Sequence, residues 1–177
     1  VTWTQDYGYS KIYAAKVVIT ETNKSYNVDV GTAFRVSNNK NLQNGGYTEH
    51  SSTIAYDSFN KRFLIVWQQY LNESSPNPPD SSDNIYGSII SINGEFTSNT
   101  FPIIDTSNDQ RYPSASYSTA ENKFLVAWYE DAGDFEIIGA QAVENNGEVN
   151  INNRLTIAVN AMNPNVSYNE ANNKFLI

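Results

Sequence analysis

The stretch Asn60-Lys61-Arg62-Phe63-Leu64-Ile65-Val66-Trp67 decides the fold because it recurs along the chain. It returns as Asn122-Lys123-Phe124-Leu125-Val126-Ala127-Trp128 and, in shorter form, as Asn173-Lys174-Phe175-Leu176-Ile177. The opening Val1-Thr2-Trp3 matches the half that the last copy lacks. Self-similarity at intervals of tens of residues is typical of repeat architectures, so we interpret the chain as a set of repeats.

Each repeat contains four apolar runs in a constant order. The first run alternates apolar and small polar residues, which is typical of a half-buried strand, and it spans residues 52–56, 113–117 and 164–168. The second run is the Phe-Leu stretch, which is apolar without alternation and therefore predicts a strand covered on both faces. Short links rich in turn residues join the two runs and predict β-hairpins.

The third run spans residues 12–18, 85–90 and 137–143, and the fourth spans 33–36, 101–104 and 155–158. Turns at Asn93-Gly94 and Asn146-Gly147 join these runs in two of the repeats. No segment shows a capped apolar stripe with helical spacing, so no helix is predicted. Four antiparallel strands per repeat predict an all-β protein built of β-propeller blades. A β-sandwich is the alternative.

The length of 177 residues predicts a single domain. The blade equivalents fall at roughly 1–47 (partial), 48–108, 109–160 and 161–177 (partial), which together make about three blades. Known propellers use at least about four blades, so we expect half or part of a larger ring. The missing blades would come from a second copy joined head to tail, as a dimer or polymer, or from further covalent blades.

These runs resemble a family of tandem β-propeller-type repeats in secreted and surface-anchored bacterial and archaeal proteins. Its repeats read roughly Pro-x-Val-Ala-Tyr, Phe-Leu-Val-Val-Trp and Ile-Tyr-Gly, and the matches here are Pro113 to Tyr117, Phe124 to Trp128 and Ile85-Tyr86-Gly87. The resemblance covers nearly the whole chain and implies an extracellular or cell-surface location. It departs at His50-Ser51-Ser52, which replaces the Pro, and at Ala14, which replaces the Gly. The shared positions are packing positions, so no functional residue follows from them.

Composition excludes several classes of function. The formal net charge of −8 and the pI near 4.5 argue against a nucleic-acid partner, because affinity for phosphate backbones comes mostly from Lys and Arg. No apolar run is long enough to cross a bilayer, so no membrane insertion is expected. The absence of cysteine excludes disulfides, Cys-ligated zinc and thiol chemistry.

Binding is predicted at one end of the blades. The links between the second and third runs differ greatly in length, and so do those between the fourth run and the next first run. In an antiparallel blade these two kinds of link emerge at the same end, whereas the other links are expected to be short. Variable loops on a rigid scaffold are where binding residues concentrate.

Two acidic and aromatic clusters fall on these links. The candidate calcium ligands are Asp80, Asp83, Asp131, Asp134 and Glu136. Calcium takes such oxygen ligands and is the one cofactor that the sequence suggests, although simple solvation of acidic loops is the alternative. The candidate ligand-binding aromatics are Tyr7, Tyr9, Tyr70, Tyr129 and Phe135. They could stack on sugar rings or simply cover blade edges.

Catalysis has little support in the sequence. His50 is the single histidine, and no Gly-x-Ser-x-Gly surrounds any serine, so no nucleophile and base are apparent. The sequence therefore predicts a non-enzymatic extracellular module for adhesion, carbohydrate or protein binding, or assembly. One alternative is a fragment of a glycan-active hydrolase, which would use a carboxylate pair that the sequence does not locate. Another is a structural subunit that assembles head to tail into a ring or filament.

Overall fold

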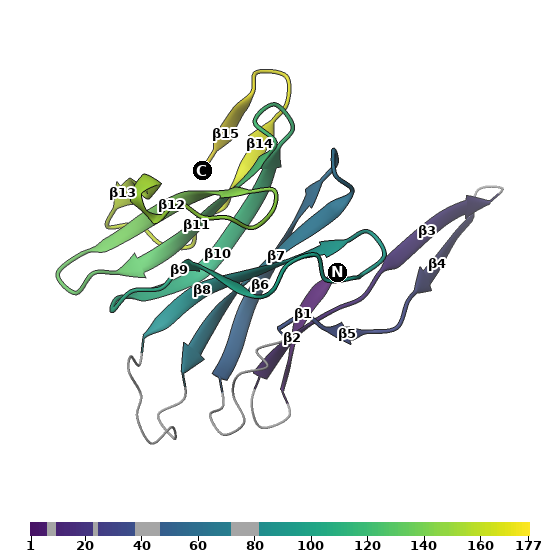
Figure 1. Cartoon of the computed structure of the whole chain (residues 1–177), viewed down its shortest axis with the longest axis horizontal. Coiled ribbons are helices and arrows are strands. Elements are labelled where there is room, and N and C mark those ends of the chain that lie inside the picture. Colours follow the sequence, from purple (N-terminus) through teal and green to yellow (C-terminus); the bar gives the residue numbers. More distant parts are fainter. Residues whose placement is uncertain (7–9, 23–24, 38–46, 72–81) are drawn as a thin grey trace.

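The computed structural model describes residues 1–6, 10–22, 25–37, 47–71 and 82–177. These residues form antiparallel strands and one short 3-10 helix, η1 (Ile151–Asn153), and they contain no α-helix, which confirms the all-β prediction. The sheets follow one another in chain order and fan out across the molecule (Figure 1).

The described residues form five sheets. Sheet 1 contains β1 (Thr2–Asp6), β2 (Ser10–Ala14) and β5 (Phe34–Arg35). Sheet 2 contains β6 (Tyr47–Asp57), β7 (Arg62–Leu71), β8 (Asp83–Ser91) and β9 (Phe101–Ile104). Sheet 3 contains β10 (Asp109–Ser118), β11 (Lys123–Asp131), β12 (Glu136–Glu144) and β13 (Leu155–Val159). The terminal hairpin pairs β14 (Ser167–Asn169) with β15 (Lys174–Leu176), and the projecting hairpin pairs β3 (Val17–Thr22) with β4 (Ser25–Val30).

The hairpins predicted between the first and second runs are confirmed as β6–β7, β10–β11 and β14–β15. Each closes through a residue with positive φ two positions before the recurring Phe: Lys61, Asn122 and Asn173. Asn enters this left-handed region more readily than most residues that carry a side chain. The turn geometry therefore explains why Asn recurs at this position in two of the three copies.

The recurring tryptophans lie in the cores between sheets. Trp67 is fully buried between sheets 1 and 2, where it packs in one cluster with Ile12 and Val36. Trp128 is fully buried between sheets 2 and 3, in one cluster with Leu64 and Ile85. The unbroken apolar character of the second run follows from this arrangement, because β7 and β11 are covered on both faces.

Strand register separates the third sheet from the other two. Trp3 and Trp67 lie opposite tyrosines in the neighbouring strand, whereas Trp128 lies opposite Gly139. A Cβ atom on Gly139 would lie 2.7 Å from Cε2 of Trp128, so the indole ring needs glycine there. Gly87 lies opposite the residue before the tryptophan of its sheet, and in sheet 3 that position is held by Ala140 rather than by Gly139. Relative to the tryptophans, the third runs of sheets 2 and 3 are therefore offset by one residue.

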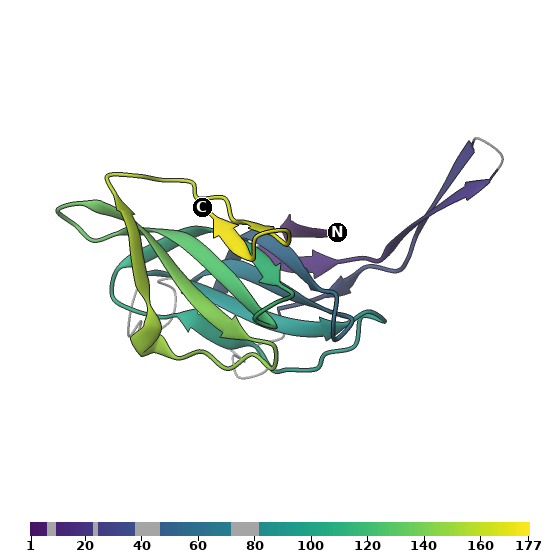
Figure 2. The same cartoon turned by 90° about the horizontal axis from the view of Figure 1, so that it is seen from above.

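The prediction for residues 12–18 was wrong, because this run is not one strand. β2 ends at Ala14, and Val17 begins the projecting hairpin, which occupies the link between β2 and β5. Length variation is therefore not confined to one end of the sheets. Residues 17–30 leave the sheet because they pair with each other, and the hydrogen bond from Gly31 N to Lys16 O (2.9 Å) closes the base of the hairpin. The hairpin stands away from the sheets in two perpendicular views (Figures 1 and 2).

Candidate functional site

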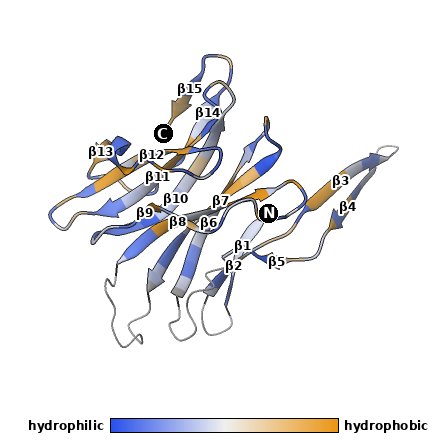
Figure 3. Ribbon diagram, viewed as in Figure 1, coloured by the Kyte–Doolittle hydropathy of each residue, from blue (hydrophilic) through white to orange (hydrophobic). Residues whose placement is uncertain are grey.

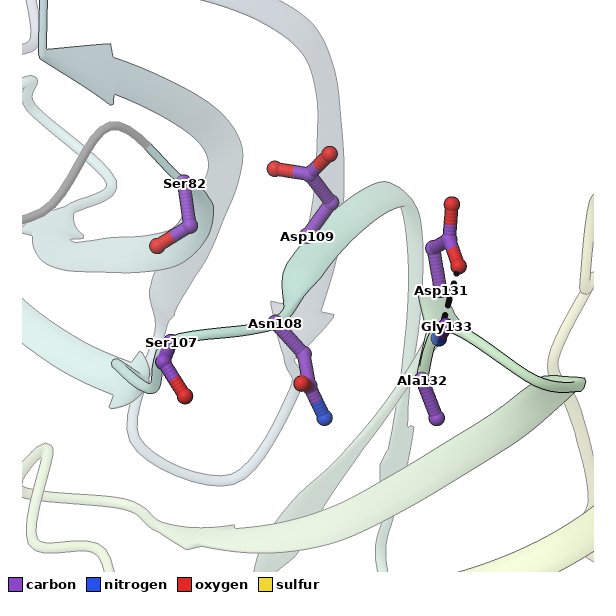
Figure 4. A pocket seen from close by; sticks show the side chains of 7 residues that line it. All are labelled: Ser82, Ser107, Asn108, Asp109, Asp131, Ala132 and Gly133. Carbon is purple, nitrogen blue, oxygen red and sulfur yellow. Dashed lines mark hydrogen bonds between the residues drawn. The ribbon is translucent and has the colours of Figure 1, made fainter.

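A hollow of about 370 Å³ opens at the end of sheets 2 and 3 (Figure 4). Its lining residues are Ser82, Ser107, Asn108, Asp109, Asp131, Ala132 and Gly133. They come from the residue before β8, from the link between β9 and β10 with the first residue of β10, and from the end of β11 with the link after it. The hollow thus combines both kinds of variable link that the sequence placed at one end.

One edge of the hollow is fixed by Arg111. Its Nε donates to Oδ2 of Asp83 and its Nη2 donates to Oδ2 of Asp109, both at 2.6 Å. The backbone N of Asp83 also donates to Oδ1 of Asp109, at 2.9 Å. Burial disfavours the charged guanidinium, but the hydrogen bond to Asp83 and the two carboxylate charges raise the pKa of Arg111 above its ordinary value. Charge-assisted bonds of this kind link β8 of sheet 2 to β10 of sheet 3 beside the hollow.

A buried carboxylate holds Asn108, one of the lining residues. Glu130 is only 1% exposed and accepts hydrogen bonds from Nδ2 of Asn108 (2.8 Å) and from Nη2 of Arg154 (2.5 Å). It also accepts one from Nε1 of Trp128, at 3.2 Å. Buried charges in folded proteins are normally paired and hydrogen-bonded in this way. Asn108 is consequently tied to the same carboxylate as the core tryptophan.

The predicted aromatic residues differ in accessibility. Tyr7 and Tyr9 lie outside the described residues. Tyr70 is half-buried and lies opposite Asp83 across β7 and β8. Tyr129 is buried, and its hydroxyl donates to Oε1 of Glu136 at 3.4 Å; burial, followed by the charge of Glu136, raises the pKa of Tyr129. Phe135 is 51% exposed and is therefore available to a ligand.

Tyr112 is a further exposed aromatic residue that the sequence did not single out. This residue is 48% exposed, and its ring centroid lies 6.3 Å from that of Tyr129. It occupies a β-bulge in β10 with a φ of 54°, where the ladder shifts between Arg111 and Ser114. Bulges commonly re-aim side chains near functional sites. The available signal was its place directly before the first run at 113–117, at the end of a variable link.

The candidate calcium ligands do not converge within the described part of the chain. Asp131 and Asp134 are exposed, and Oδ1 of Asp131 accepts a hydrogen bond from the backbone N of Gly133 at 3.0 Å. Asp83 faces Arg111, and Asp80 lies outside the described residues. No group of three or more His, Asp or Glu side chains suited to a metal occurs among the residues described.

Comparisons with known proteins add no constraint, because no protein-family model, no curated protein and no solved structure matches this chain. Within residues 1–6, 10–22, 25–37, 47–71 and 82–177, no helix has the length and apolar character needed to cross a membrane.

Proposed function

We propose that sheets 1, 2 and 3 and the terminal hairpin are successive blades, complete or partial, of a β-propeller-type module. Repeated contacts between neighbouring sheets support this proposal. Phe34 of sheet 1 packs on the Gly94 turn of sheet 2, and Phe101 of sheet 2 packs on the Gly147 turn of sheet 3. Each sheet therefore meets the next in the same way, as blades around a common axis do.

The module is proposed to be non-enzymatic and to bind ligands, as an adhesion, carbohydrate-binding or protein-binding part of a secreted or cell-surface protein. The observation that carries this proposal is the hollow, whose polar lining comes from sheets 2 and 3 and their links, and whose Asp109 is bound by Arg111. Preformed concave sites with a few fixed polar groups are typical of small-ligand binding. Variable links and the resemblance to surface-protein repeats point in the same direction.

A carbohydrate suits this site best. The carboxylates of Asp109 and Asp131 and the amide of Asn108 offer hydrogen bonds to sugar hydroxyls. The exposed rings of Tyr112, in the bulge of β10, and of Phe135, in the link after β11, offer apolar faces. The net charge of −8 disfavours anionic glycans, so a neutral or basic sugar is the proposed class.

The test is a glycan array probed with the 177-residue chain, followed by a hydrolysis assay on every glycan that binds. Asp131→Asn should weaken binding at least about tenfold, because an ionised acceptor is lost from the lining. Glu148→Gln is the matched control, because Glu148 is an exposed carboxylate on the turn before η1. The proposal fails if no glycan binds or if both variants bind alike. Turnover of a bound glycan would instead support the hydrolase alternative.

A second candidate function is head-to-tail assembly, and the uneven sheets favour it. Sheet 1 has three strands and the terminal hairpin has two, whereas sheets 2 and 3 have four each. Unpaired strand edges are templates for pairing with another chain. The tail of one copy would join the head of the next, and such contacts close into a ring or continue as a filament. Further covalent blades would satisfy the same edges.

A further inference from the structure

The projecting hairpin has one apolar and one polar face. Its register places Val17, Ile19 and Glu21 on one face with their partners Val30, Val28 and Tyr26. The other face carries Val18, Thr20 and Thr22 with their partners Asp29, Asn27 and Ser25. Such alternation is typical of a strand pair that covers an apolar surface on one side and meets water on the other.

This apolar face has no cover in the described structure. Ile19 is 65% exposed, Tyr26 68%, Val28 56% and Val30 62%. The hydrophobic part of β3 lies on a ribbon that stands clear of the sheets (Figure 3). A two-stranded hairpin is only marginally stable alone in water, and a contiguous exposed apolar patch usually marks an interaction surface.

The position of the hairpin in sheet 1 indicates what it covers. In sheets 2 and 3 the link between the third and fourth strands is a glycine turn, and it lies on the last strand of the preceding sheet, β5 or β9. A Cβ on Gly94 would lie 3.2 Å from the Phe34 ring, and one on Gly147 would lie 2.7 Å from the Phe101 ring. The projecting hairpin occupies the same link in sheet 1. It should therefore lie on the fourth strand of whatever sheet precedes sheet 1.

β13 is the fourth strand of sheet 3, and in the described structure no such link lies on it. Leu155 occupies the position in β13 that Phe34 occupies in β5 and Phe101 in β9. Each of the three lies opposite the equivalent residue of the neighbouring strand: Ala14 for Phe34, Gly87 for Phe101 and Ala140 for Leu155. Phe34 and Phe101 are half-buried, but Leu155 is 54% exposed. Its neighbour Ile157 is 43% exposed. β13 thus lacks the link that covers the equivalent strands.

We propose that the projecting hairpin of one copy of this chain docks on β13 of a second copy, with the apolar face of the hairpin on Leu155 and Ile157. This inference rests on the proposed head-to-tail assembly, in which the terminal hairpin of one copy leads into sheet 1 of the next. The contact continues an interface that the chain already makes twice, at Phe34 and at Phe101. It joins two different surfaces and is therefore heterologous.

Sedimentation velocity on the 177-residue chain and its variants tests this contact. The parent should form dimers or larger species as concentration rises. The double variant Ile19→Ser/Val28→Ser should be monomeric at concentrations where the parent associates. The double variant Thr20→Ser/Asn27→Ser changes a directly opposed pair on the polar face and should associate like the parent. Circular dichroism melts confirm that each variant is folded.

A mixing experiment tests the two-surface geometry. Leu155→Ser should be monomeric alone, because its docking surface is damaged. Mixed with Ile19→Ser/Val28→Ser, it should form a one-to-one dimer, since one intact hairpin then meets one intact β13. A monomeric parent overturns the inference. So does association by Leu155→Ser alone, because the hairpin would then bind another surface. None of these substitutions touches the hollow, so glycan binding reports separately on the binding module.

Discussion

β9 and β13 are equivalent strands with opposite surroundings. Each pairs with the third strand of its sheet and carries one bulged residue, Ile103 in β9 and Ile157 in β13. Ile103 is 1% exposed beneath sheet 3, whereas Ile157 is 43% exposed. The difference shows that a fourth strand becomes core only when the next sheet covers it. Repeat proteins are stabilised by such contacts between neighbours, so end units behave differently from central ones.

The largest effect is expected at the covered interface itself. Trp128→Ala should lower the free energy of unfolding by about 3–5 kcal/mol, because it removes a fully buried indole from the core between sheets 2 and 3. Chemical denaturation gives the value. Phe59→Ala is the control, since Phe59 is 76% exposed and should change stability by less than about 0.5 kcal/mol. Similar losses for both variants would contradict the assigned core.

A direct comparison of the two bulged isoleucines should give the next largest effect. Ile103→Ala is expected to cost about 2–5 kcal/mol, as truncations of buried Ile usually do. Ile157→Ala should cost less than about 1 kcal/mol when measured at concentrations where the chain is monomeric. Equal costs in the monomer would mean that β13 is already covered within one chain.

Gly139 and Gly87 offer a sharper comparison inside the core. Gly139→Ala should cost about 1–3 kcal/mol, because the added methyl group would overlap the Trp128 ring. Gly87→Ala should cost less, since Ala140 already occupies the equivalent place in sheet 3 and the nearest atom, Cδ1 of Ile103, is 3.1 Å from the added Cβ. Thermal melts of both variants decide the order. If Gly87→Ala is the more damaging, the register derived for sheet 3 is wrong.

The smallest effect concerns pH. Sheets 2 and 3 carry an equivalent buried pair in reversed order, Glu49 opposite Gln69 and Gln110 opposite Glu130. Burial raises the pKa of Glu49, and its hydrogen bonds to Ser37 and to Ile12 N only partly oppose this. The folded state therefore binds a proton more tightly than the unfolded state does. The stability that Glu49 contributes is fully present at low pH and declines as pH rises above about 4.5 through the raised pKa.

Urea denaturation across this pH range, with Glu49→Gln as the reference, measures that contribution. The parent should lose stability relative to Glu49→Gln as pH rises. An increase in its relative stability with pH would mean that the contacts to Ser37, Lys11 and Ile12 outweigh burial, and would reverse the assigned direction.

Much of the fold could be predicted from recurrence alone. The Phe-Leu stretch and its tryptophans identified the central strands, because a strand covered on both faces needs an unbroken apolar run. The projecting hairpin could not be predicted in the same way. Val17 and Val18 have the same β-branched character whether their strand joins a sheet or pairs locally, so residues 12–18 were interpreted as one strand.

The candidate site was harder to predict than the core. The variable links indicated at which end of the sheets the site lies. Which residues meet there depends on how the strands pair, and the sequence does not show that. Arg111 meets Asp83 across two sheets, and such a pairing has no signature in one sequence. Tyr112 lies in a bulge where the pairing of β10 with β11 shifts. The residues around Tyr112 do not by themselves indicate that bulge. Calcium was predicted because several acidic residues lie close together in the sequence of the links. Closeness in sequence does not by itself bring their carboxylate oxygens together around one ion.

Amide hydrogen exchange at two protein concentrations tests whether a second copy of the chain covers β13. β9 should exchange equally slowly at both concentrations, because sheet 3 covers it within the chain. β13 and the projecting hairpin should exchange fast in dilute solution and become protected together as concentration rises. Exchange in β13 that does not change with concentration, in a chain that remains folded, would contradict the claim that a second copy covers this strand.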